Sequence, residues 1–226
     1  MAEIQGSKGS PSLDMTPMVD LAFLLVTFFM LTAQFKPQEI VAVDTPSAKT
    51  TKEIPKEDLM LVTIDSAGRV FWTVDNEELR GSVLDQVSAS TKTPFTVEQR
   101  KKFTKEGMIG VPLNILGTYL EKEGPQKKLI SDESKGTPYD SLNNELREWI
   151  SAVRTVHLAM KNDQEELIKM GQVLPRGEKK IKEMKWGIKG DGEAPYEVVQ
   201  KIIKVFQDPS LMISRFSLVT DLEEFK

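Results

Sequence analysis

The feature that most constrains this chain is one strongly apolar stretch near its N-terminus. Residues 18–35 read MVDLAFLLVTFFMLTAQF, with fourteen apolar positions among eighteen. A helix rises about 1.5 Å per residue, so the stretch from Pro17 to Lys36 spans roughly 30 Å, the thickness of one hydrocarbon core. Apolar residues occupy nearly all sides of such a helix, whereas a helix packed on a globular core has one apolar stripe. The pattern predicts a single transmembrane helix over residues 17–36.

A cleaved signal peptide is the main alternative to a retained helix. Such a peptide needs a positively charged start, an uninterrupted apolar segment and a cleavage site of small residues. Here Lys8 is opposed by Glu3 and Asp14, and Asp20 interrupts the start of the apolar stretch. Residues 31–33, Leu-Thr-Ala, make a poor cleavage site. The sequence therefore favours a helix that stays in the protein.

The start of this helix carries an unusual acid. Thr16 and Pro17 suit a helix start, because threonine caps free N–H groups and proline is tolerated at the first helical position. Asp20 then falls in the first turn, and a charged carboxylate inside a bilayer costs about 2.5–3.5 kcal/mol. Either Asp20 stays ionised at the headgroup level, or it faces a partner or a wet path. Thr27, seven residues later on the same face, either bonds back to its own helix or faces that path.

Composition excludes several classes of function. The 30 basic and 34 acidic residues give a net charge of −4, so nucleic-acid binding, which needs clustered positive charge, is not expected. The absence of cysteine excludes disulfides and cysteine-ligated metals. His157 is the one histidine, and we expect an ordinary surface or half-buried side chain. The Gly190–Gly192 turn lacks the lysine and hydroxyl of a phosphate loop. We expect no enzymatic activity, cofactor or metal.

The first half of the remaining chain predicts a hairpin and two helices. Residues 37–57 hold three prolines and no apolar periodicity, which indicates an extended linker or a strand-like arm. Residues 59–64 and 70–74 are strand-like around turn residues 65–68. Residues 77–90 have helical apolar spacing. Thr96 and Gln99 form a capping-box pattern that opens a short polar helix ending at Gly107.

The second half predicts one long helix and a closing strand–helix–strand unit. Residues 124–138 are rich in Gly, Pro, Lys and Ser, and we expect a loop. The next helix should share one apolar face made by Leu142, Leu146, Trp149, Ile150 and Val153. The lysines of 161–185 indicate a solvated face. A strand at 186–189, a helix at 195–207 that buries Val199, Ile202, Ile203 and Phe206, and a strand at 212–219 complete the chain.

Two motifs, in this order, resemble those of the ExbD/TolR biopolymer-transport family. The first is LDMTPMVD at residues 13–20, followed at once by the apolar stretch. The second comprises IKGDG at 188–192, Pro195-Tyr196 and RFSLVT at 215–220. Asp14 stands where the family often has asparagine. The additional segment, about 76–185, resembles the long insert of ExbD members from the Bacteroidetes group.

The resemblance implies a fold and a topology. It implies a cytoplasmic tail at 1–16, a single transmembrane helix at 17–36, a linker or arm at 37–57 and a periplasmic domain at 58–226 with the insert at 76–185. The expected fold is thus one N-terminal transmembrane helix plus a periplasmic α/β (α+β) domain, whose small mixed sheet is covered by helices. The implied location is the bacterial inner membrane, with the N-terminus in the cytoplasm.

The resemblance also implies a role for Asp20. In the family the Asp of the Thr-Pro-x-x-Asp segment carries protons, so Asp20 is the expected carrier and Thr27 a candidate polar residue facing the pore. Two chains are expected to pair inside a pentamer of a polytopic ExbB-like partner and to energise outer-membrane uptake through a TonB-like protein. Two alternatives stay open: a TolR-like motor subunit for envelope maintenance, and a membrane-tethered periplasmic scaffold or binding protein with an idle Asp20.

Overall fold

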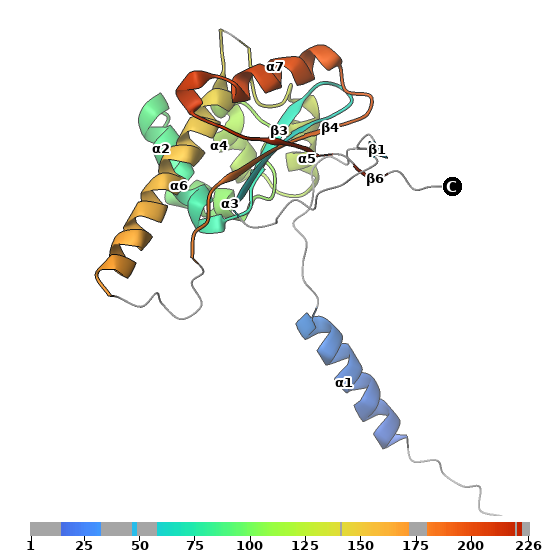
Figure 1. Ribbon diagram of the computed structural model, residues 1–226. Helices are drawn as coiled ribbons and strands as arrows, with labels where there is room; N and C mark the ends of the chain where they lie inside the picture. The colour runs from blue at the N-terminus through green and yellow to red at the C-terminus, as the bar shows by residue number, and fades with distance from the viewer. Residues whose placement is uncertain are drawn as a thin grey trace, which may run out of the picture. The chain divides into compact units, whose positions relative to one another are not determined.

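A computed structural model describes residues 15–32, 47–48, 58–140, 142–171, 180–219 and 221–222. The chain divides into two compact units, Met1–Pro37 and Gln38–Lys226, drawn as ribbons in Figure 1. The expected cytoplasmic tail, residues 33–36 of the expected span and most of the expected arm at 37–57 lie outside the described residues.

The first unit contains helix α1, Thr16–Thr32. Every residue of α1 is exposed, and none of its side chains packs into a core. Among the helices in the described ranges, none combines the length and the apolar character required to cross a membrane.

The second unit is built on a small mixed sheet of four strands in the order β3-β2-β4-β5. These strands are β2 (Leu59–Ile64), β3 (Val70–Val74), β4 (Lys185–Gly190) and β5 (Ser217–Val219). Strands β2 and β3 are antiparallel, whereas β4 runs parallel to both β2 and β5. Strands β1 (Ser47–Ala48) and β6 (Asp221–Leu222) form a separate parallel pair.

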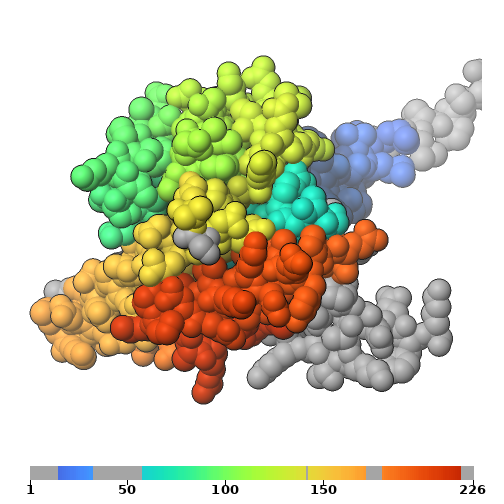
Figure 2. All heavy atoms as spheres, turned by 90° about the horizontal axis from the view of Figure 1, so that it is seen from above, coloured from blue at the N-terminus to red at the C-terminus, as the bar shows by residue number. Residues whose placement is uncertain are grey.

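Six α-helices accompany this sheet in the described part of the second unit. They are α2 (Glu77–Thr91), α3 (Val97–Lys105), α4 (Leu113–Glu121), α5 (Pro125–Glu133), α6 (Glu145–Lys169) and α7 (Tyr196–Phe206), followed by a 3-10 turn at Pro209–Leu211. In Figure 2 the orange-red residues, which include α7, lie beside yellow residues of the insert.

One face of the sheet forms the core. Side chains alternate between the two faces of a strand, and the register places one buried apolar set on a single face: Met60, Val62, Ile64, Val70, Trp72, Val74, Trp186 and Ile188. The Trp72 ring lies 4.7 Å from Trp149 of α6 and 6.3 Å from Phe103 of α3, measured between centroids. Trp186 lies 6.3 Å from Phe206 of α7. Helices α3, α6 and α7 therefore pack on the same face.

Most elements expected from the sequence are confirmed. The small mixed sheet covered by helices is present, and the hairpin of 59–64 and 70–74 has the expected bounds. Helix α2 buries the four apolar residues that gave the helical spacing: Leu79, Val83, Leu84 and Val87. The capping box is formed, since Gln99 N–H donates to Thr96 Oγ1 and Thr96 N–H donates to Gln99 Oε1. Helix α3 ends at Lys105, two residues before the expected Gly107.

Three expectations were wrong. Residues 124–138 are not a loop, because Pro125 occupies the first position of α5, where proline is tolerated, and Ile130 packs against the core. Leu142 is fully exposed before α6 rather than on its buried face. His157 is buried, with 4% of its surface exposed.

One boundary, the burial of two residues and one whole helix also differ from what the sequence predicts. The last strand, expected over 212–219, begins only at Ser217 because a 3-10 turn and irregular backbone precede it. In the closing helix, Ile202 and Phe206 are buried, whereas Val199 and Ile203 are half-buried. Helix α4 was not expected at all.

The insert closes the β3 edge of the sheet. Trp72 and Ile109 exchange two backbone hydrogen bonds of 2.8 Å, and Thr137 N–H donates to Val70 O at 2.8 Å. Gly136, next to Thr137, allows this second segment to come close to Val70. Its φ of +81° is a backbone conformation that residues with a side chain disfavour. Two insert segments thus pair with the strand that would otherwise end the sheet.

Candidate functional site

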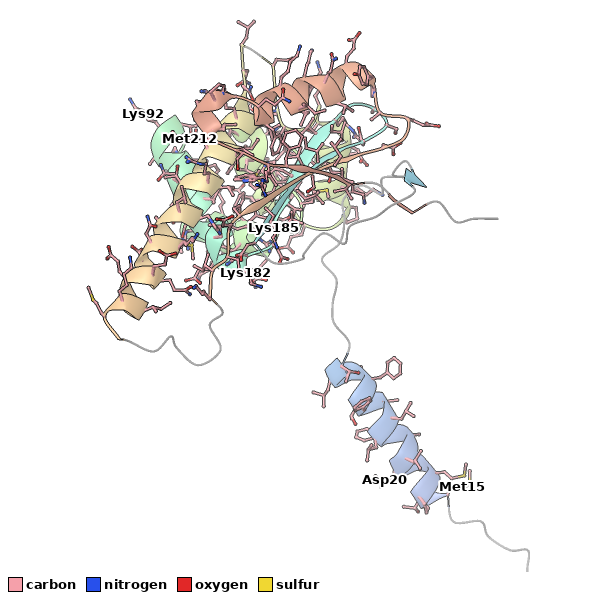
Figure 3. All side chains as sticks on the ribbon, viewed as in Figure 1. Met15, Asp20, Lys92, Lys182, Lys185 and Met212 are labelled. Atoms are coloured by element: carbon pink, nitrogen blue, oxygen red, sulfur yellow. The ribbon has the colours of Figure 1, made fainter. Side chains whose placement is uncertain are left out.

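Helix α1 places Asp20 near its beginning. We expected Asp20 within the first turn. Because the helix starts at Thr16, Asp20 is instead the fifth helical residue and lies just beyond that turn. Val19 N–H donates to Met15 O at 3.0 Å, which fixes the first turn. Figure 3 shows Asp20 and Met15 at the same end of α1. Within the described residues, the Asp20 carboxylate is exposed and makes no ion pair.

The rest of α1 offers a solvent-exposed apolar surface. Its large apolar side chains are between 53% and 87% exposed, from Val26 to Leu31. Apolar surface of this extent, on a helix that packs on none of the described residues, is typical of a segment covered by lipid or by another protein. Asp20 is the single ionisable residue of helix α1, whose other exposed side chains are mostly apolar.

Thr27 lies on the face of Asp20, since seven residues make about two helical turns. Its hydroxyl donates to Leu24 O at 3.0 Å, as expected for a threonine that bonds back to its own helix. Thr32 does the same toward Phe28 O at 2.8 Å. The Thr27 hydroxyl oxygen keeps acceptor capacity for a second partner, because a hydroxyl combines one donor with two lone pairs.

The glycine-rich turn at 190–192 and His157, both considered in the sequence analysis as possible sites, have structural roles in the second unit. Gly190 is the last residue of β4, and Asp191 and Gly192 begin the turn that leads to α7. In this turn Asp191 Oδ1 accepts from Glu193 N–H at 2.9 Å, and Asp191 N–H donates to Ile64 O. Burial lowers the pKa of His157, and its Nε2 has no hydrogen-bond partner among the described residues. No cluster of three potential metal ligands occurs in the described part of the chain.

One polar feature was not expected from the sequence. A groove of about 550 Å³ lies where the end of α6, the start of α2, the start of β2 and residues 180–181 meet. It is lined by Asp58, Asp75, Asn76, Glu78, Met160, Asp163, Gln164, Leu167, Lys180 and Ile181. These residues come from four separate segments, so spacing along the chain gives no signal for the groove.

Comparisons with known proteins agree with the motif at Asp20. The family model described as "Biopolymer transport protein ExbD/TolR" matches residues 7–223, nearly the whole chain. A "Biopolymer transport protein ExbD" from Aquifex aeolicus (strain VF5) is 25% identical over 111 residues, which cover 48% of this chain and 81% of that protein. No solved structure matches. Since the family model spans both the Asp20 segment and the sheet domain, the chain belongs to the ExbD/TolR family of biopolymer transport proteins.

Proposed function

We propose that this chain is the single-helix, ExbD-like subunit of a proton-driven motor in the bacterial inner membrane, with Asp20 as its proton carrier. The observation that supports the proposal most is the solitary Asp20 carboxyl on an otherwise apolar, uncovered helix of an ExbD/TolR family member. The chain would act as a transport subunit and not as an enzyme, with protons as the coupling ion and no cofactor.

The proposed membrane span covers residues 17–36. Helix α1, Thr16–Thr32, supplies residues 17–32 of this span, about 24 Å of helix at 1.5 Å per residue. The uniform exposure of its apolar side chains fits a lipid or protein environment on all sides. The short N-terminal tail would then be cytoplasmic and the sheet domain periplasmic.

The chemistry of the motor would follow from the free-energy cost of a charged side chain in the apolar interior of the membrane. A carboxylate is costly there, but it becomes cheap when protonated or when it faces a polar partner. Each protonation of Asp20 would therefore change which position of the helix is favoured. The membrane potential offers about 2.3 kcal/mol per proton per 100 mV, enough to bias such a step.

A partner must complete the proton path. One helix, or a pair, uses its backbone polar groups internally and cannot enclose a wet route. We infer that a pair of these chains sits inside a pentamer of a polytopic ExbB-like protein, whose polar side chains would line the route beside Asp20 and Thr27. The output would pass through the sheet domain to a TonB-like protein that energises outer-membrane uptake, or to a TolR-like role in envelope maintenance.

The test is the substitution Asp20→Asn in the native operon. Asparagine keeps the shape and hydrogen-bonding capacity of a protonated aspartic acid but cannot release a proton. We expect loss of uptake of a TonB-dependent substrate, with normal protein level and normal pull-down of the polytopic partner. The matched control is Asp14→Asn, the same substitution six residues earlier, which should retain uptake. Normal uptake by Asp20→Asn would exclude the carrier role.

The alternative of a membrane-tethered scaffold predicts a different pattern. An idle Asp20 would tolerate Asn, and native membranes would yield no stoichiometric polytopic partner on co-purification. Proton flux into liposomes separates the two further, since the motor requires flux only when both proteins are present. Strong Asp20-dependent flux from this chain alone would contradict a path between subunits.

A further inference from the structure

The groove at the end of α6 combines an apolar floor with an acidic wall. Met160 and Leu167 lie seven residues apart on α6, so they share one face, and Ile181 lies across from them. Leu167 is 41% exposed, and the neighbouring Ile168 and Met170 are 42% and 73% exposed. Apolar surface therefore continues from the groove along the last turn of α6, as it does at protein-binding sites.

The charge of the groove is strongly negative. Among the described residues, four acids, Asp58, Asp75, Glu78 and Asp163, line it against one base, Lys180. Glu78 stands in the first turn of α2. Neither Glu78 nor Asp163 forms an ion pair within the described ranges, so neither charge is neutralised by a neighbouring side chain there.

The wall of the groove is held in place by backbone contacts. Asp58 Oδ2 accepts from Lys182 N–H at 3.1 Å, and Asp58 O accepts from Lys185 N–H at 2.7 Å. Lys182 and Lys185 are labelled in Figure 3. Ile181 N–H donates to Gln164 Oε1 at 2.7 Å, which ties this segment to α6. Asp58 adopts a φ of +55°, a costly conformation for a non-glycine residue. The groove is thus built before any ligand arrives.

We propose that this groove docks a cationic, amphipathic segment of a partner protein, with lysine or arginine side chains against the acids and an apolar side chain on Met160 and Leu167. A volume of about 550 Å³ lies within the usual range of 300–1,000 Å³ for binding pockets. Lysine and arginine suit such a site because their aliphatic stems cover apolar surface while their charged ends meet carboxylates. Anionic lipid and nucleic acid would be repelled.

The proposal goes beyond the motor role and does not depend on Asp20. The probe is a fluorescein-labelled short peptide of alternating lysine and leucine, titrated with the full-length chain in nonionic detergent and followed by fluorescence anisotropy. Comparison peptides replace every lysine with glutamate, or every leucine with serine. We expect that, of the three peptides, only the lysine–leucine peptide binds saturably. Added salt should weaken this binding, because exposed charges are screened.

Variants assign the binding to the groove. Glu78→Gln and Asp163→Asn should each weaken binding about 2–5-fold, the usual effect of one exposed ion pair. Leu167→Ser should weaken it as well while leaving the fold intact, since this side chain is already 41% exposed. Glu197→Gln, an exposed acid on α7, is the matched control and should bind as the unaltered chain does.

Two results would overturn the proposal. One is equal binding of the glutamate–leucine peptide, which would remove the charge argument. The other is a pattern of variants that places the binding elsewhere. Either the Glu197→Gln control weakens peptide binding as much as the groove variants do, or Glu78→Gln and Asp163→Asn do not weaken it. Because Asp20→Asn should leave peptide binding unchanged, failure here is distinguishable from failure of the motor proposal.

Discussion

Gly136→Ala is the sharpest test of how the insert holds the sheet. Gly136 has a φ of +81°, and a Cβ atom there would lie 2.5 Å from the Val70 backbone nitrogen and 2.9 Å from the Val70 oxygen. A left-handed conformation costs an alanine about 1–2 kcal/mol. The displaced backbone would also lose the hydrogen bond from Thr137 N–H to Val70 O, worth about 0.5–1.5 kcal/mol. We expect a total loss of about 1.5–3.5 kcal/mol in unfolding free energy.

Gly171→Ala is the matched control for this substitution. Gly171 has nearly the same φ, +74°, but a Cβ atom there would meet none of the described residues within 4 Å. Its loss should therefore contain only the conformational cost of about 1–2 kcal/mol. The difference between the two variants isolates the contact between the insert and the β3 edge.

Urea unfolding followed by tryptophan fluorescence measures both variants. All three tryptophans, Trp72, Trp149 and Trp186, lie in the core of the sheet domain, so the signal reports on that domain even in the full-length chain in detergent. With a slope of about 2 kcal/mol per M urea, Gly136→Ala should lower the midpoint by about 1–2 M. Equal midpoints for the two alanine variants would refute the contact with Val70.

Two further predictions concern His157 and Thr27. Burial, the largest influence, and Lys161 lower the pKa of His157 below its ordinary 6.5, although Asp58 and the Lys182 backbone act in the opposite direction. The folded state then binds fewer protons than the unfolded state just below pH 6.5, so unfolding free energy should fall as pH drops through that window; urea unfolding of His157→Gln should show a flatter pH dependence. Thr27→Val removes the hydroxyl and should reduce transport about 2–10-fold, whereas Thr27→Ser should retain it; equal transport by both would leave Thr27 without a polar role.

The sequence predicted those elements whose signals are local. Helix α2 was predictable because Leu79, Val83 and Leu84 repeat at helical spacing, and α3 because Thr96 and Gln99 form a capping box. Helix α5 was missed because the segment 124–138 that contains it is rich in Gly, Pro, Lys and Ser, a composition typical of loops. It forms through tertiary contacts, including the ion pair between Lys127 and Glu106.

The candidate site could be predicted only where it depends on one helix. Asp20 and Thr27 share a face because of helical periodicity, which the sequence contains. The groove could not be predicted, because residues 181 and 182 link distant segments: Ile181 N–H donates to Gln164 of α6 and Lys182 N–H donates to Asp58 before β2. The burial of His157 has the same origin, since Asp58 and Lys182 approach it from outside α6.

The closed β3 edge limits how these domains can aggregate through their sheets. A domain whose sheet has two open edges can pair with one copy at each edge, so its copies can form an unlimited fibre. A domain whose sheet has one open edge can pair with only one further copy. Ile109 and Thr137 occupy the β3 edge, and β5 ends the sheet on the other side in the described part of the chain. Assembly of copies of this domain through strand pairing would therefore stop at a dimer. By covering the β3 edge, the insert prevents the sheet from extending into a fibre.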